Sequence, residues 1–151
     1  MGWWSTDILG GDTPLDWEDE FYGISKVDKF DGAKKGKVNY IPKDVLEQRQ
    51  FEFSDLLDAS INYMEPDIGY QVLAVMMMRA GASIDPVVKG KMVAAALGDQ
   101  WAKEDSEREE TIHGLVKALG QYDGQTPILI KSRGLFEVMA ENLSSEKENK
   151  N

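Results

Sequence analysis

Carboxylates are the side chains best supplied for chemistry in this chain of 151 residues, and four of them gather near its beginning. The four are Asp7, Asp12, Asp16 and Glu20. Carboxylate oxygens are the ligands that Mg²⁺ and Ca²⁺ prefer, so the group predicts a metal-dependent hydrolase or nucleotide-processing enzyme as one reading of the chain. The spacing matches no calcium-binding loop. A solvated first turn at the positive end of a helix dipole explains the same acids without a metal, and we favour that reading.

Other catalytic groups are scarce. The chain has no cysteine, which excludes disulfides, thiolate zinc sites and thiol nucleophiles. Its single histidine, His113, follows Ile112 at the edge of an apolar helix face, and we interpret it as structural rather than as a general base. The Gly10-Gly11 pair resembles a phosphate-binding turn, but no Lys follows it and the nearby acids repel phosphate. We therefore predict no catalytic residue and no cofactor.

Charge limits the partners. The 17 basic and 27 acidic residues give a net charge of −10, which repels nucleic-acid backbones and anionic membranes. We expect no direct nucleic-acid binding. No apolar run reaches the roughly 20 residues that span a bilayer, and the first residues lack the features of a secretion signal. The expected location is therefore cytoplasmic, with no membrane association.

Three of the four tryptophans lie within the first seventeen residues. Trp3 and Trp4 are adjacent, and neighbouring side chains of an extended segment point in opposite directions. One ring can then enter the core while the other faces outward, where tryptophan is a strong interface anchor. Trp3 and Trp4 are the predicted interaction residues.

The elements that position these residues are predicted to be helices. Thr13 and Pro14 indicate a capped helix start, and this helix runs to about Ser25 with Trp17 and Phe21 on its inner face. A solvated, mobile loop follows at about 26–41. Apolar residues at helical spacing then predict a helix over residues 42–64. These residues are Phe53, Leu56, Leu57, Ile61 and Met64.

The stretch 68–80 is apolar nearly all round, which predicts a central helix that ends at Gly81. Its run Met76-Met77-Met78 indicates core filling rather than an adaptable binding groove. Asp85-Pro86 begins the next helix, which ends at Gly98. Its expected inward residues are Val88, Met92, Val93, Ala96 and Leu97.

A capping box at Ser106–Glu109 predicts a further helix, which has a clear apolar stripe and ends at Gly120. The stripe consists of Ile112, Leu115, Val116 and Leu119. The segment near 127–131 is either one short strand or extended chain that plugs the core. A last helix includes Leu135, Val138, Met139 and Asn142.

These elements predict an all-α fold. It is a single compact bundle of five to six helices over residues 1–143, with an extended Trp-rich segment at its beginning. Residues 144–151 have nothing to bury and are expected to form a disordered tail.

The opening combines Gly and Trp, a turn with Asp, and an Asp-Trp helix start, at Gly2, Trp3 or Trp4, Asp7, Asp12, Leu15, Asp16 and Trp17. In these residues it resembles a family of small bacterial and phage proteins of unknown function, which begin with Gly and a Trp, followed by a turn with Asp or Asn and an Asp-Trp helix start. The resemblance implies a similar helical fold and a bacterial or phage source, with no activity attached. Where the family usually has Gly after the Trp, this chain has a second Trp and Ser5.

The functional hypothesis is a small acidic interaction or inhibitor module that binds a protein or itself. One version is a phage-encoded inhibitor whose carboxylates mimic nucleic acid and steer it to a basic cleft of a host protein. The alternative is the carboxylate-based metal enzyme.

Overall fold

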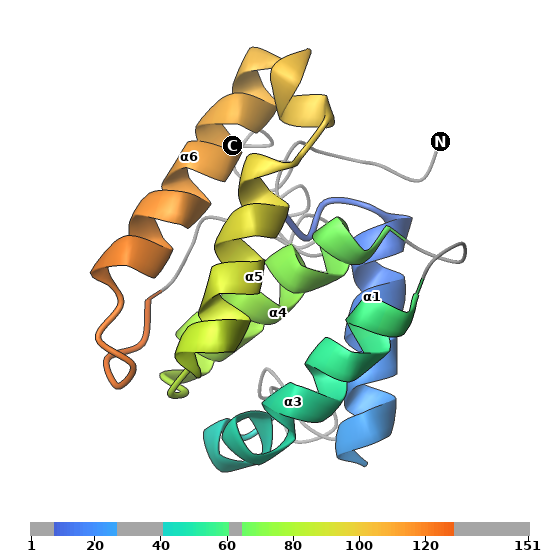
Figure 1. Ribbon diagram of the computed structural model, residues 1–151, viewed down its shortest axis with the longest axis vertical. Helices are drawn as coiled ribbons and strands as arrows, with labels where there is room; N and C mark the ends of the chain where they lie inside the picture. The colour runs from blue at the N-terminus through green and yellow to red at the C-terminus, as the bar shows by residue number, and fades with distance from the viewer. Residues whose placement is uncertain (1–7, 27–40, 61–64, 129–151) are drawn as a thin grey trace, which may run out of the picture.

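The computed structural model describes residues 8–26, 41–60 and 65–128, which form five α-helices and one 3₁₀ turn (Figure 1). The helices are α1 (Asp12–Ser25), α3 (Lys43–Ala59), α4 (Pro66–Ala80), α5 (Pro86–Leu97) and α6 (Ser106–Gln121), and the turn η1 (Trp101–Lys103) joins α5 to α6. These ranges contain no strand, so the all-α prediction is confirmed for them. None of their helices has the length and apolar character needed to cross a bilayer.

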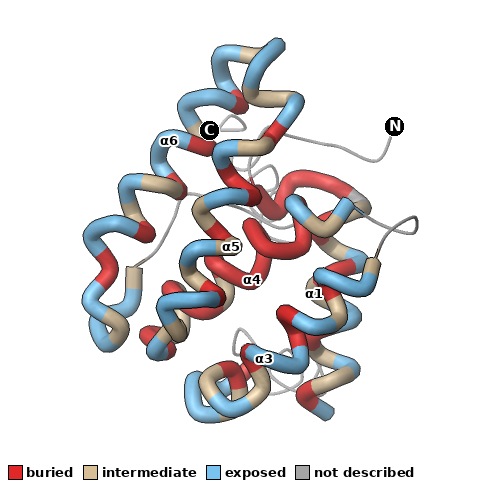
Figure 2. Tube along the Cα trace, in the orientation of Figure 1, coloured by how far each residue is buried: buried red, intermediate tan, exposed pale blue. Residues whose placement is uncertain are grey.

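Helix α4 is the centre of the fold, as its sequence predicts. Every residue from Ile68 to Val75 is buried, as are Met77 and Met78, and Figure 2 shows the helix almost wholly in the colour of buried residues. It packs against α1, α3, α5 and α6. An element that is apolar on all sides is stable in water only when neighbours enclose it. The run of methionines is therefore core, although Met76 is only partly buried.

Aromatic side chains fill the space between α1, α3 and α4. The rings of Trp17 and Phe21 lie 6.0 Å apart, and those of Phe21 and Phe53 lie 5.0 Å apart. Gly69 of α4 faces them at very close range. A Cβ atom on Gly69 would overlap Cδ2 of Leu57 and would come within 3.0 Å of the Trp17 ring. Only glycine lets the three helices approach this closely.

Two helix starts differ from the prediction. Helix α1 has Gly11 at its N-cap with extended backbone, and the first bond runs from the Leu15 N–H to the Gly11 carbonyl (3.2 Å), so Thr13 is already helical. Helix α6 is capped by Asp105 rather than Ser106. The Asp105 carboxylate accepts hydrogen bonds from two backbone N–H groups, and its charge suits the positive end of a helix.

Three other predicted helix boundaries agree with the structure, whereas the helix predicted from 42 to 64 is shorter: it corresponds to α3, which ends at Ala59 with Ser60 as its C-cap. Ile61 and Met64 lie outside the described residues. Asp85 caps α5 by accepting from the Val87 N–H (2.9 Å), and Gly98 ends that helix. Gly81 ends α4 with φ of 73°, a left-handed conformation that favours glycine. Helix α6 continues one residue past Gly120, to Gln121.

After α6 the chain returns to the end of α4. The Tyr122 hydroxyl donates to the Ala82 carbonyl (2.6 Å), and the Ile128 N–H donates to the Met78 carbonyl (2.9 Å). Pro127 and Ile128 belong to neither helix nor strand. The rest of the predicted 127–131 segment, the last predicted helix, the tail and residues 27–40 of the predicted 26–41 loop lie outside the described residues. At the end of that loop, Ile41 is buried in the core rather than solvated.

Candidate interaction surface on helix α5

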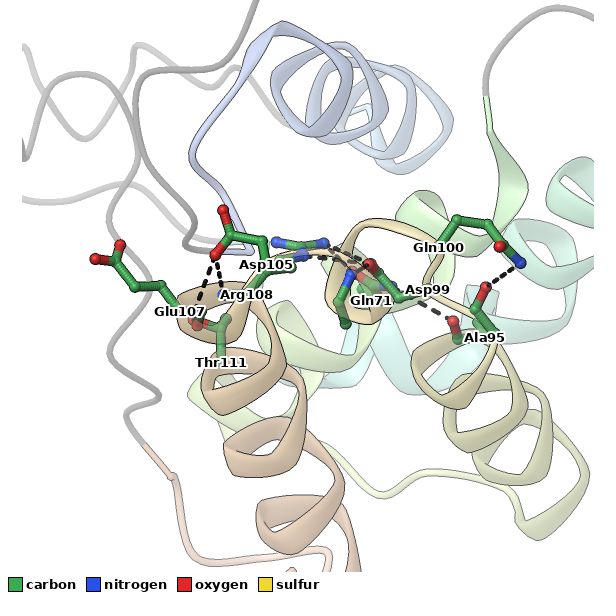
Figure 3. Close-up of polar contacts among 10 residues, drawn as sticks. Gln71, Ala95, Asp99, Gln100, Asp105, Glu107, Arg108 and Thr111 are labelled. Carbon is green, nitrogen blue, oxygen red and sulfur yellow. Dashed lines mark hydrogen bonds and ion pairs between the residues drawn. The ribbon is translucent and has the colours of Figure 1, made fainter.

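The strongest polar cluster is a buried ion pair between Asp99 and Arg108 (Figure 3). Asp99 Oδ2 accepts from Arg108 Nη2 (2.8 Å) and from Gln71 Nε2 (2.9 Å), while Gln71 Oε1 accepts from Arg108 Nη2 (2.8 Å). Asp99 Oδ1 accepts from the Ala102 N–H (2.9 Å), and the Trp101 ring covers the guanidinium at 4.8 Å. The local sequence pattern does not predict this cluster. The polar groups of these side chains form hydrogen bonds with one another. The cluster therefore links α4, α6 and the turn between α5 and α6.

Asp67 lies near this cluster, and its pKa shifts in the direction opposite to that of Asp99. Burial raises the pKa of Asp99, but hydrogen bonds from Arg108 and Gln71 outweigh burial and hold the pKa below its ordinary value. Burial and the charge of Asp99 raise the pKa of Asp67. Carboxylates with diverging pKa values are typical of acid–base pairs. Here both oxygens of Asp99 already accept hydrogen bonds within the fold, which favours a structural role.

The raised pKa of Asp67 gives a pH-dependent prediction. The folded state holds the Asp67 proton more tightly than the unfolded chain, so this group costs stability as pH rises through its folded pKa. We expect Asp67→Asn to raise the denaturation midpoint at about pH 7 and to change it little at about pH 3. Urea titrations at the two pH values test this. Equal effects at both values would show that the charge of Asp67 is not responsible.

A second cluster joins α3, α4 and α5. The Tyr70 hydroxyl lies 2.8 Å from Ser54 Oγ and donates to Asp58 Oδ1 (2.5 Å), and Lys91 Nζ lies 2.5 Å from Asp58 Oδ2. Burial and the hydrogen bond to Asp58 raise the pKa of Tyr70 to about 12. Lys91 Nζ also lies 3.4 Å from Ser54 Oγ. Ser54 is 4% exposed, too deep for a nucleophile that must meet a substrate, so the cluster reads as a structural tie.

The predicted metal ligands fall only partly within the described residues. Asp16 and Glu20 lie one turn apart on α1, and both are exposed. Asp7 and the side chain of Asp12 lie outside the described part, as do Trp3 and Trp4. Among the residues that the structure describes, no three His, Cys, Asp or Glu side chains are grouped so as to hold a metal ion. The metal site therefore stays a prediction.

His113 is exposed, which corrects its predicted place at the edge of the apolar face. Its side chain is 75% exposed, and its Nε2 lies 3.9 Å from Glu109 Oε1 one turn earlier. The residues one position before it and two after it, Ile112 and Leu115, do face the core. The apolar face that α6 buries in the core is thus narrower than the sequence pattern predicts, and it does not include His113.

Large apolar side chains are exposed at two places on the described surface: Phe51 of α3, which is 52% exposed, and the outer face of α5. The α5 face is the larger of the two in number of residues. It consists of Val87, Gly90, Ala94 and Leu97, which recur at three- and four-residue spacing on one side of the helix. Val87 and Leu97 are each 65% exposed, and both glycine and alanine are exposed as well. The prediction that Leu97 faces the core is wrong. Val88, Met92 and Ala96 hold the opposite side of α5 in the core.

Helix α5 is also the one outer helix of the described part that contains no acidic residue. Between residues 86 and 97 the only charged side chains are Lys89 and Lys91, whereas exposed acids lie on the other outer helices. Those acids include Asp16, Asp19 and Glu20 on α1, Asp44, Glu52, Asp55 and Asp58 on α3, and Glu107, Glu109 and Glu110 on α6. In Figure 1, α5 lies in front of α4 between α6 and α3, and none of the other described helices crosses its outer side.

Comparison with protein-family models, with curated proteins and with solved structures finds no match to this chain. The resemblance of its first residues to the bacterial and phage family accordingly stays a prediction.

Proposed function

We propose that the protein is a non-catalytic interaction module that binds a protein through the outer face of α5. The observation that carries the proposal is that α5 has apolar residues on two opposite sides. One side lies in the core, and the other is exposed to water. A helix of this composition is normally enclosed by neighbours. Exposed apolar residues that are rimmed by polar ones mark sites of protein–protein contact more often than isolated exposed ones.

The two polar clusters support a non-catalytic role because their contacts hold the helices of the fold together. The Asp99–Arg108 pair and the Tyr70–Asp58–Lys91 group hold the helices that carry α5, so its outer face is presented on a rigid support. A pre-organised surface loses little entropy on binding. The described acids lie on α1, α3 and α6, on both sides of α4, rather than on one continuous face. This spread favours an apolar contact at α5 over mimicry of nucleic acid.

Site-specific photo-cross-linking in cells tests the proposal. A photoreactive amino acid in place of Ala94 is expected to form a discrete protein adduct, because Ala94 lies at the middle of the exposed stripe. The same amino acid in place of exposed Gly114 on α6 serves as the control and is expected to form none. Adducts of equal yield at both positions, or none at Ala94, would remove α5 as the binding surface.

A further inference from the structure

We propose that the side chain of Asp67 is a proton-controlled contact between the start of α4 and the last turn of α5. Helices α4 and α5 pack against each other, and Gly98 is the C-cap of α5. A Cβ atom on Gly98 would lie 3.3 Å from the Ala94 carbonyl oxygen, 3.4 Å from Asp67 Oδ2 and 3.9 Å from the Ala95 carbonyl oxygen. The Asp67 carboxyl group therefore lies close to the carbonyl end of α5.

This position disfavours the ionised form of the carboxyl group. The last carbonyl groups of a helix carry partial negative charge, so they repel a carboxylate. Each carbonyl oxygen has two lone pairs, and the Ala94 oxygen uses one of them to accept from the Gly98 N–H (2.9 Å). A protonated carboxyl group has an O–H that donates to such an oxygen, whereas a carboxylate only accepts. Binding of one proton thus replaces repulsion with attraction at this contact.

The charged groups nearest in sequence and structure act in the same direction. Asp99 directly follows Gly98, and its negative charge acts on Asp67. Arg108 of α6 is already engaged by Asp99 and Gln71. Glu65, two residues before Asp67, is also acidic. Among the described residues, the Asp67 side chain has neither an ion pair nor a hydrogen bond that would favour its charged form.

The other elements that pack against α4 supply no compensating charge at this place. Helices α1 and α3 meet α4 at Gly69 through the apolar side chains of Trp17 and Leu57. The two lysines of α5 lie in its first half, far along the helix from Gly98. The N-terminal end of α4 itself favours a carboxylate, because Asp67 is the second residue of that helix. Burial and the charge of Asp99 outweigh this effect and raise the pKa of Asp67.

The direction of the pH effect follows. Because the closed contact binds the proton more tightly, the contact is stable at low pH and weakens as pH rises through the folded-state pKa of Asp67. The last turn of α5 should then open more often. Leu97 belongs to that turn. The consequence for binding rests on the proposed function: the α5 face is better ordered, and binds more tightly, in mildly acidic solution than at neutral pH.

Nuclear magnetic resonance of the full chain tests the contact without any partner. The backbone N–H groups of Gly98 and Asp99 donate to the Ala94 and Ala96 carbonyls, so their protection from hydrogen exchange reports opening of this turn. Protection is measured relative to the unfolded chain at each pH from about 3 to 7, and the side-chain carboxyl ¹³C shift of Asp67 is followed in the same samples. We expect the protection of both amides to fall by about tenfold, with the midpoint at which Asp67 ionises.

Three variants separate the proton from the rest of the fold. Asp67→Asn is neutral and keeps a donor, so protection should stay high at every pH. Asp67→Ala lacks both charge and donor, so protection should be lower than in Asp67→Asn and independent of ionisation at this position. Asp44→Asn is the matched control, because Asp44 is the second residue of α3 and is exposed. It should leave the fall in protection unchanged.

The outcomes also separate this proposal from the proposed function. A fall in protection that persists in Asp67→Asn, or a midpoint that differs from that of the Asp67 carboxyl group, overturns the proton-controlled contact. Equal protection in Asp67→Asn and Asp67→Ala overturns the hydrogen bond to α5. Cross-linking at Ala94 decides independently whether α5 is a binding surface.

Discussion

A protein in which Asp99 is replaced by Ala is expected to lose about 3–5 kcal/mol of its free energy of unfolding. The substitution removes the carboxylate that neutralises Arg108, whose side chain is fully buried. A buried charge that loses its opposite charge keeps its desolvation cost, and this cost is what makes the loss large. Chemical denaturation at neutral pH measures it.

A matched control comes from the surface of α3. Arg49 and Glu52 also form an ion pair (3.0 Å), but both side chains are substantially exposed. Glu52→Ala should cost less than about 1 kcal/mol, because water and salt screen such pairs. The double variant Asp99→Ala/Arg108→Met should recover part of the loss, since it removes the stranded charge with its partner. If Asp99→Ala proved no more harmful than Glu52→Ala, the cluster would not be a brace.

The second large effect is expected at Gly69, where Ala should destabilise the fold by about 1–3 kcal/mol. Alanine is the better helix former, so local propensity alone predicts the opposite sign. The added methyl group meets Leu57 and the Trp17 ring, so the buried Leu57 side chain or the helices themselves must shift to admit it. Thermal and urea denaturation give the size of the change. Gly114→Ala, in open space on α6, should stabilise by up to about 1 kcal/mol and provides the comparison.

The contact with Leu57 can be tested on its own. In a Leu57→Ala background, Gly69→Ala should cost clearly less than in the unaltered chain, because the atom that it overlaps has been removed. A cost that is the same in both backgrounds would assign the effect to the Trp17 ring or to the backbone.

The elements that could be predicted from the sequence are those set by local pattern. The all-round apolar run of α4 identified it as the central helix, and Asp85, Gly81 and Gly98 marked helix ends because caps act within a few residues. Thr13 and Ser106 misled for the same reason. Asp105, the actual cap of α6, is adjacent to Ser106, and Gly11, the actual N-cap of α1, lies two residues before Thr13. One sequence does not say which of several nearby candidates adopts the extended backbone.

The buried pair and the α5 face depend on contacts between distant parts of the chain. Gln71 and Arg108 are 37 residues apart, and charged residues such as Asp99 and Arg108 are usually solvated, so nothing local marks them as partners. Leu97 is apolar, and the helical spacing of the apolar residues of α5 predicts that its side chain faces the core. Its exposure follows from how α4 and α6 leave one side of α5 uncovered, which the pattern of one helix does not contain.

The position of α4 also bears on how the protein unfolds. Without α4, the described helices would fall into two pairs, α1 with α3 and α5 with α6, joined only by the contact between α3 and α5. Neither pair has a core of its own, because both bury their apolar faces against the same central helix. The described helices are therefore expected to unfold as one cooperative unit, in which the central backbone amides of α4 exchange with solvent only when the whole unit opens.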